Sequence, residues 1–220
     1  MLTQPNKISM KRRQERKRRI TEQRRTQIFD AALDLFSRVG FAQATTHDIA
    51  QGAGVAEGTI YNYFQSKRDL LVSLASSQIL SETFQGLLER PAEIDFATLL
   101  SSLMEHRLTL GFDRGDTLAV LFSKIHRDPE LRAQFVEQVT QPALTLVEAR
   151  LESRIASGEL RPMDVAVVAR AIVGTIIGFI LLYRLERGKS PIEGKPRNQL
   201  AAELTNLLLL GLKRSGVPSD

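Results

Sequence analysis

Hydrophobic residues recur every three or four positions through most of the chain, which is the spacing of a helix that buries one face. A first amphipathic helix is predicted over residues 20–39 and ends at Gly40; its apolar stripe is Ile28, Ala32, Leu35, Phe36 and Val39. The pattern predicts a long helix over 70–88 that breaks near Pro91, and then helices over 95–111 and 118–126 separated by a break at 111–115. The sequence therefore predicts an all-α protein.

The later apolar runs are also helical in their spacing. Asp128 and Pro129 form a helix start, with Asp as the cap and Pro in the first turn. That helix runs to Pro142, which either kinks it or starts the next helix, and the helical pattern ends near Gly158. Asp164 opens the most apolar helix, and a loop over 187–196 separates it from a last helix over 197–213.

Residues 45–71 predict two short helices joined by a tight turn, followed by the start of a third. Thr45 with Asp48, and Ser66 with Asp69, have the spacing of capping boxes, in which the side chains satisfy free amides at a helix start. Gly54 lies where the chain must turn. This is a helix-turn-helix pattern, and its second helix is expected over residues 57–63.

The second of these helices has polar groups around one buried residue, Ile60. Gly58 allows close approach of a phosphate, and hydroxyl and amide groups for phosphates or base edges come from Thr59, Tyr61, Asn62 and Tyr63. The alternative is a surface helix whose tyrosines only cover the core.

The block TTHDIAQGAGVAEGTIYNYFQSKRDLL resembles the DNA-binding domain of the TetR (tetracycline repressor-like) family of transcriptional regulators. The specific resemblance covers residues 20–70. It implies a phosphate contact by Thr46, recognition-helix contacts by Thr59 and Tyr61, and further phosphate contacts by Tyr63 and Lys67. His47, beside Thr46, is expected at the DNA-proximal surface.

Two positions depart from the family pattern. Ala56 stands where a Ser or Thr cap is common, so one amide there lacks a side-chain partner. Glu57 stands where many members have a Lys or a neutral residue. Phosphates repel a carboxylate, but a carboxylate can accept a hydrogen bond from a cytosine amino group.

Charge is concentrated at the N-terminus. Residues 1–25 contain ten Lys or Arg and two Glu, a net charge of +8, whereas the whole chain is +5 and the remainder is therefore −3. Residues 1–19 are predicted to form a basic flexible arm, disordered or loosely helical, that contacts phosphates or enters a minor groove. The alternative is a solvated tail.

The helix that Asp164 opens has more apolar surface than one small helical domain can bury. Its uncharged run from Ala171 to Tyr183 is 13 residues long, shorter than the roughly 20 residues that cross a bilayer, which predicts a buried helix and no membrane span. Gly174 and Gly178 lie on one face and allow close helix approach. We expect a homodimer through the two C-terminal helices, which the resemblance would place in a four-helix bundle.

Enzyme and metal chemistry are not indicated. The chain has no Cys, its three His are isolated, and its glycines fit neither the dinucleotide fingerprint nor a phosphate loop. We expect no catalytic residue, no metal and no cofactor. No secretory signal is visible, which favours a cytoplasmic protein. An enzyme on a helical scaffold is the disfavoured alternative.

The predicted organisation is a basic arm (1–19), a three-helix DNA-binding domain with a helix-turn-helix (20–70) and a helical ligand-binding and dimerisation domain (71–220). The family resemblance implies a repressor released from a pseudo-palindromic, double-stranded DNA operator by a small effector. Residues 95–183 are rich in apolar side chains, which predicts a lipophilic effector. The candidate polar anchors, each with an alternative as a surface or capping residue, are His106, Arg107, His126, Arg170 and Tyr183. The alternative function is a ligand-independent DNA-binding or architectural protein.

Overall fold

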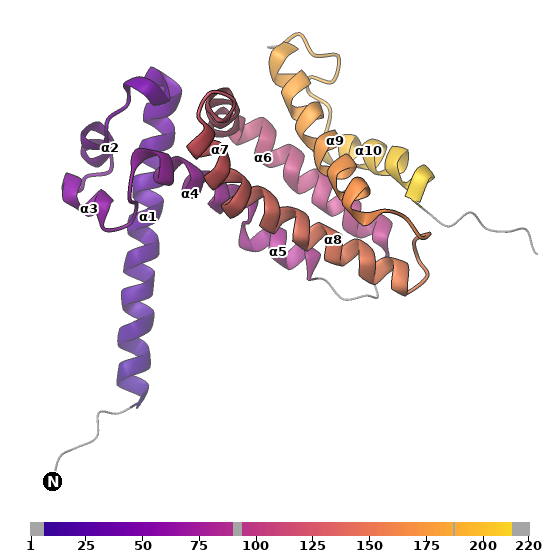
Figure 1. The fold of residues 1–220 in the computed structure, drawn as a ribbon, viewed down its shortest axis with the longest axis horizontal. Coiled ribbons are helices and arrows are strands. Elements are labelled where there is room, and N and C mark those ends of the chain that lie inside the picture. The colour runs from indigo at the N-terminus through magenta and orange to yellow at the C-terminus, as the bar shows by residue number, and fades with distance from the viewer. Residues whose placement is uncertain (1–6, 90–93, 187, 213–220) are drawn as a thin grey trace, which may run out of the picture. The chain divides into compact units, whose positions relative to one another are not determined.

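The computed structural model describes the backbone of residues 7–89, 94–186 and 188–212, and the side chains of these residues except 7–11 and 114–123. Every regular element in those ranges is helical, which confirms the predicted fold class (Figure 1). The chain divides into two compact units, Met1–Leu74 and Ala75–Asp220. The boundary lies inside helix α4 (Lys67–Ile79), close to the boundary expected at residue 70.

Unit 1 is built on helix α1 (Lys7–Gln43), against which α2 (Thr46–Gly52) packs; α3 (Glu57–Tyr61) packs in turn against α2. Its core combines the predicted stripe of α1 with apolar residues of the following helices: Ile28, Ala32, Phe36, Ile49, Ala50, Ile60 and Phe64 are all nearly inaccessible. The Phe29 and Phe64 rings meet with centroids 5.4 Å apart. The three-helix assembly therefore has the core that the sequence predicts.

The bounds of α1 differ from the prediction at both ends. The helix begins at Lys7 rather than at residue 20, so residues 7–19 of the predicted basic arm are a continuation of α1; the rest of the predicted arm lies outside the described residues. Gly40 adopts φ 80° and ψ 158° and kinks the helix, which then resumes to Gln43. Val39, expected in the buried stripe, is 47% exposed because it lies in the last turn before this kink.

Local capping fixes the starts of α2 and α4. The Thr45 hydroxyl accepts a hydrogen bond from the Asp48 amide at 3.1 Å and donates one to the Asp48 carboxylate at 2.6 Å. The Ser66 hydroxyl accepts from the Asp69 amide at 3.1 Å, while the Asp69 carboxylate accepts from the Gln65 amide at 2.8 Å. The Thr45 and Ser66 hydroxyls thus satisfy amides that a helix start leaves free, as predicted. The Asp48 carboxylate, however, bonds the Thr45 hydroxyl and not an amide, so the capping box predicted at α2 is only half formed.

The helix expected over 70–88 is two helices, α4 and α5 (Glu82–Leu88). The separation was missed in the sequence because no Gly or Pro marks it. Its cause is Ser81, whose hydroxyl accepts from the Phe84 amide at 3.3 Å and caps a new helix start.

Helix α6 (Phe96–Ile125) is continuous for 30 residues, so the break predicted at 111–115 is wrong. Gly111 does not end a helix. It lets α6 approach α9 (Val165–Glu186), because a Cβ atom at residue 111 would lie 2.3 Å from Cδ1 of Ile180. A packing glycine inside a helix is indistinguishable in sequence from a helix-ending one.

Pro142 lies in the first turn of α8 (Gln141–Ala156), directly after a π-helical turn, η1 (Val136–Thr140), that continues from α7 (Pro129–Phe135). The Gln141 amide bonds the Val136 carbonyl five residues back, which widens the helix just before the proline ring. The predicted start at Asp128 is confirmed by its hydrogen bond from the Leu131 amide at 3.1 Å.

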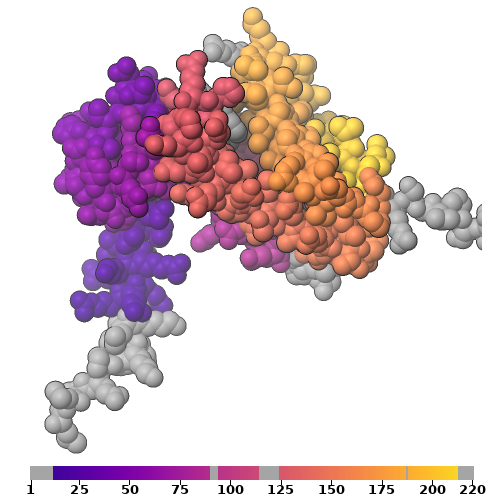
Figure 2. Space-filling model, viewed as in Figure 1, coloured from indigo at the N-terminus to yellow at the C-terminus, as the bar shows by residue number. Residues whose placement is uncertain are grey.

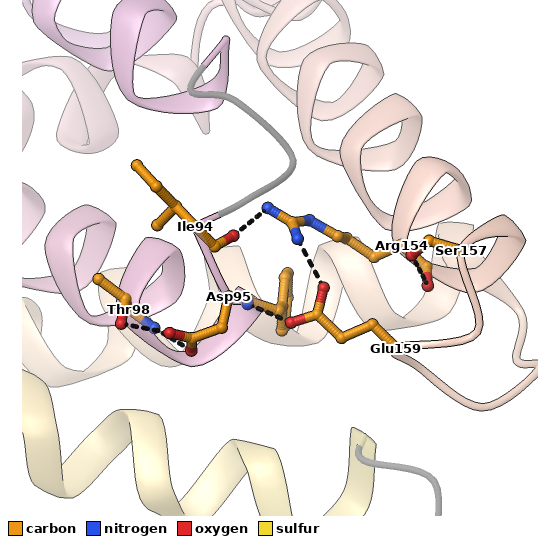
Figure 3. Close-up of polar contacts among 7 residues, drawn as sticks. Ile94, Asp95, Thr98, Arg154, Ser157 and Glu159 are labelled. Carbon is orange, nitrogen blue, oxygen red and sulfur yellow. Dashed lines mark hydrogen bonds and ion pairs between the residues drawn. The ribbon is translucent and has the colours of Figure 1, made fainter.

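A buried ion pair joins the end of α8 to the start of α6 (Figure 3). Arg154, only 3% exposed, donates to the Glu159 carboxylate at 2.6 Å and to the Ile94 carbonyl at 2.5 Å. The other Glu159 oxygen accepts from the Phe96 amide, in the first turn of α6. The pair therefore satisfies helix-end groups as well as its own charges, which a buried pair requires.

The two C-terminal helices, α9 and α10 (Arg197–Leu212), both pack on α6 and leave an apolar face exposed. Large exposed side chains on them are Val167, Ile177, Leu181, Leu182, Leu185, Leu207 and Leu210. Among the described residues, α9 alone is long and apolar enough to cross a membrane. A partner helix packed on this apolar face would explain its exposure as well as a membrane would. Dimerisation through α9 and α10 stays a prediction.

Candidate nucleic-acid interface and ligand cavity

The recognition helix α3 is anchored by one residue and open elsewhere. Ile60 is 1% exposed, whereas Tyr61 is 54% exposed, and Gly58 and Asn62 are also exposed. Thr59 and Tyr63 are half-buried. The helix ends at Tyr61 rather than at residue 63, so Asn62 is its C-cap and Tyr63 follows it. As predicted, Ala56 provides no side-chain cap for α3.

A polar cluster joins the start of α2 to α3. The Thr46 hydroxyl lies 2.7 Å from Oε1 of Glu57 and 3.1 Å from the Tyr61 hydroxyl. Nδ1 of His47 lies 3.5 Å from Oε2 of Glu57. Four of the residues singled out in the sequence therefore form one connected group on unit 1.

Lys67 does not extend into solvent. Its ammonium donates to the carbonyls of Phe41 at 2.8 Å and Ala44 at 2.7 Å, and lies 4.6 Å from the centroid of the Phe41 ring. It thus closes the end of α1, where carbonyls lack helical partners. The phosphate contact expected of Lys67 would require the ammonium to leave these carbonyls.

Unit 2 contains a cavity of about 310 Å³, within the range typical of small-molecule sites. Its walls are the apolar faces of helices α5, α6, α8 and α9, with the end of α4 and the α7–η1 turn. Of its described lining residues, only Arg107, Thr140 and Arg150 carry polar side chains, and none is acidic. The site accepts an apolar body, and the cations among its described lining residues are Arg107 and Arg150.

Arg107 is the one predicted anchor that lines the cavity. Its guanidinium donates to the carbonyls of Gln78 and Ile79 at the end of α4 and lies 3.9 Å from the centroid of the Phe84 ring. Burial lowers the pKa of Arg107 to about 10. The group therefore stays protonated at neutral pH and can meet an anionic or carbonyl group of a ligand.

The other four predicted anchors do not line the cavity. His106 faces the Ser81 hydroxyl at 3.5 Å, and its pKa is lowered by burial and by neighbouring Arg107. His126 caps the end of α6. Arg170 pairs with Glu148 at 2.9 Å. Tyr183 stacks on Phe112 and donates to Glu193 at 3.0 Å, which raises the pKa of the phenol.

Sequence reasoning missed Thr140 and Arg150. A signal for Arg150 exists, because it lies with Ala143 and Val147 at helical spacing on α8, in a stripe that is otherwise apolar. Burial lowers the pKa of Arg150, as does Arg154, while Glu159 raises it. A cation on an apolar stripe is a sign of a site.

Two family descriptions match the chain. Residues 28–74 match "Bacterial regulatory proteins, tetR family", and residues 91–192 match "Tetracyclin repressor-like, C-terminal domain". The chain belongs to the TetR family. Regulators of this family are DNA-binding proteins without enzymatic activity, so the chain is a DNA-binding transcriptional regulator and not an enzyme.

Individual proteins match most of this chain in sequence or in structure. A "Fatty acid metabolism regulator protein" of Bacillus subtilis (strain 168) is 30% identical over 154 residues, covering 68% of this chain and 78% of the relative. The crystal structure of FadR from Bacillus subtilis in complex with stearoyl-CoA has a TM-score of 0.70 at 26% identity; the match covers 87% of this chain and 98% of that protein. The structure of the fatty acid degradation regulator FadR from Bacillus halodurans has a TM-score of 0.69 at 26% identity; the match covers 90% of this chain and 97% of that protein.

Proposed function

We propose that this regulator is a cytoplasmic repressor that binds a pseudo-palindromic operator as a homodimer and is released by an amphipathic ligand with a long apolar part. The cavity in unit 2 carries this proposal. Its apolar walls favour an apolar body because burial stabilises by about 25 cal/mol per Å², whereas an unpaired polar group would be destabilised there.

The charged residues that line the cavity restrict the class of ligand that it can bind. Arg107 and Arg150 are the cationic lining residues, and no described lining residue is acidic. A ligand with an anionic or carbonyl head and an acyl-like tail fits this arrangement. The relative whose structure was solved with stearoyl-CoA supports a long-chain acyl compound.

Arg107 offers a route from cavity to DNA-binding unit. Its donors are engaged by Gln78 and Ile79, in the last turn of α4, the helix in which unit 1 passes into unit 2. A ligand head that accepts from Arg107 competes with these carbonyls and loosens that turn. The ligand then favours a dimer whose recognition helices no longer match successive major grooves.

On the DNA side, we propose contacts by His47, Glu57, Gly58, Thr59, Tyr61, Asn62 and Tyr63. Thr46 and Lys67 contact phosphate only if their donors leave the Glu57 carboxylate and the carbonyls at the end of α1, respectively. In a dimer formed through α9 and α10, two such surfaces would face two half-sites about one helical turn apart.

A thermal-shift titration tests the ligand class. Acyl compounds of increasing chain length should raise the melting temperature progressively, because a ligand that binds only the folded state stabilises it by mass action. Ala143→Phe fills the cavity wall and should abolish the shift. Ala149→Phe, on the exposed side of the same helix, is the matched control and should retain it.

If a highly polar compound alone raised the melting temperature, the apolar-ligand proposal would be wrong. If no compound did and Ala143→Phe changed nothing, the ligand-independent DNA-binding alternative would replace it.

A further inference from the structure

Glu57 is an unusual group for a surface that meets DNA. It is the first residue of α3, its side chain is 41% exposed, and phosphates repel its charge. A free carboxylate there would weaken DNA binding. The structure shows instead that this carboxylate is held by two side chains from α2, Thr46 and His47.

The direction of each hydrogen bond in this group is determined by chemistry. An ionised carboxylate only accepts, so the Thr46 hydroxyl donates its single proton to Oε1 of Glu57 at 2.7 Å. Thr46 is then the acceptor for the Tyr61 hydroxyl at 3.1 Å. The hydrogen bonds are therefore donated in one direction, from Tyr61 to Thr46 and from Thr46 to Glu57.

This series of hydrogen bonds changes the role expected of Thr46. Its one proton is used within the protein, so donation to a phosphate, as expected from the sequence, would break the bond to Glu57. His47 is 3.5 Å from the other carboxylate oxygen and opposes the negative charge when protonated. Thr46 and His47 therefore fix Glu57 in position and leave acceptor capacity on both of its oxygens.

We propose that Glu57 is a base-reading residue that accepts a hydrogen bond from the N4 amino group of a cytosine in the major groove, with Thr46 and His47 as positioning residues. The proposal rests on the proposed function, because it requires that α3 enters the major groove of an operator. It names one determinant of the operator sequence.

The chemistry of the four bases selects cytosine. In the major groove guanine presents two acceptors and thymine an acceptor and a methyl group, so both repel or fail to pair with a carboxylate. Adenine presents an amino donor beside the N7 acceptor, which disfavours the second carboxylate oxygen. Cytosine presents its amino donor without that neighbouring acceptor and is the best match.

Selection from a randomised pool of duplex DNA, followed by affinity measurement, tests this directly. The wild-type protein should enrich a pseudo-palindrome with a required C·G pair at one position of each half-site. Replacing that pair should lower affinity by about 5- to 150-fold, the range of one good base contact.

Glu57→Gln provides the decisive variant. Its amide both donates and accepts and so matches adenine N6 and N7, which should move the preference at that position from C to A. Glu22→Gln is the matched control, because it removes one negative charge from an exposed site on α1 in the same unit. It should leave every base preference unchanged.

The positioning role is tested on Thr46. Thr46→Val keeps the shape but removes the donor, and should weaken discrimination at the Glu57 position alone. Thr46→Ser keeps the hydroxyl and should restore it. A protein that only lost folding would lose affinity at all positions equally, and circular dichroism melting checks this separately.

The outcomes separate this proposal from the function on which it rests. If the wild-type protein enriched no sequence, the operator-binding function would fail. If it enriched a pseudo-palindrome whose every preference survived Glu57→Gln, the function would stand and the base-reading role of Glu57 would be overturned. Equal loss of discrimination at all positions in Thr46→Val would overturn the positioning role of Thr46.

Discussion

At the scale of single residues, Gly111 determines how closely α6 and α9 approach beside the cavity. A Cβ atom there would come within 3 Å of three atoms of the Ile180 side chain. The proximity of α9 was not predictable from the sequence around residue 111, since Ile180 lies far along the chain.

Gly111→Ala should destabilise the protein by about 1–3 kcal/mol, because a methyl group forced into a packed contact displaces its neighbours. Gly86→Ala is the control. Gly86 lies within α5 with open space around it, so alanine there should stabilise by about 0.5–1 kcal/mol through helix propensity. Urea denaturation of both variants measures the difference; equal stabilities would refute the close contact.

Arg107 was predictable as a polar residue in an apolar segment, but not as a group bonded to the end of α4. Arg107→Met keeps much of the apolar stem and removes the charge. We expect the affinity for an acyl ligand with an anionic head to fall by about 10- to 150-fold, the range of a hydrogen bond to a charged group. Arg170→Met, which removes a charge that does not line the cavity, is the control. If calorimetric titration found the same ligand affinity in Arg107→Met as in the wild-type protein, Arg107 would be excluded as the anchor.

At the scale of elements, helix starts were the part of the fold best predicted from sequence. Thr45, Ser66 and Asp128 each cap a helix as expected, because a cap depends on residues within one turn. The break expected at 111–115 was wrong, because the continuity of α6 depends on packing against a distant helix. The local spacing of apolar residues does not predict contacts between helices that are distant in the sequence.

The basic N-terminal part of α1 is a regular helix from Lys7, where the sequence predicted a disordered or loosely helical arm. Its described residues 12–19 are all exposed, and Figure 2 shows this indigo segment clear of the rest of unit 1. Residues 7–19 extend the helix by about 20 Å, at about 1.5 Å per residue. The length and charge suit a line of phosphate contacts.

Deleting residues 1–19 should flatten the salt dependence of DNA affinity by about 0.9 in the log–log slope for each phosphate that the shortened protein no longer neutralises. The preference for the operator over random duplex should remain. Replacing Arg16, Lys17, Arg18 and Arg19 by Gln keeps the length and helix propensity and should also reduce the slope. An unchanged slope in both proteins would show that this segment does not contact DNA.

The exposed apolar face of α9 and α10 predicts where two protomers meet in a dimer. Nothing lies within 4 Å of a Cβ atom built at Gly178, so an arginine there fits the single chain. Gly178→Arg should nevertheless convert dimers to monomers or aggregates, because it places a bulky charge where two helices would meet.

Ile20→Arg is the control for Gly178→Arg, since Ile20 is a 49% exposed apolar residue on α1. Sedimentation velocity should find dimers of the control. A stable Gly178→Arg dimer would place the interface elsewhere.

At the scale of the whole molecule, the function requires two sites, one in each unit. The sequence predicted the DNA-binding unit in detail because a helix-turn-helix is a local pattern with capping residues at fixed spacing. The cavity is assembled from residues between 79 and 180. Only its apolar character was predictable, together with one of five proposed anchors, because the walls come from helices whose packing is not local.

We expect occupancy of the cavity and binding to the operator to weaken one another. Coupling between two sites is reciprocal, so a ligand that weakens operator affinity by some factor must itself bind the operator complex more weakly by the same factor. Fluorescence anisotropy of a labelled operator, titrated with a long-chain acyl compound, measures the first factor. Calorimetric titration of the acyl compound into the free protein and into the operator complex measures the second.

We expect the two factors to be equal, each about fivefold or more, to vanish together in Ala143→Phe and to persist in Ala149→Phe. An acyl compound that bound the protein with equal affinity in the presence and absence of operator would show that the cavity and the operator site are not coupled.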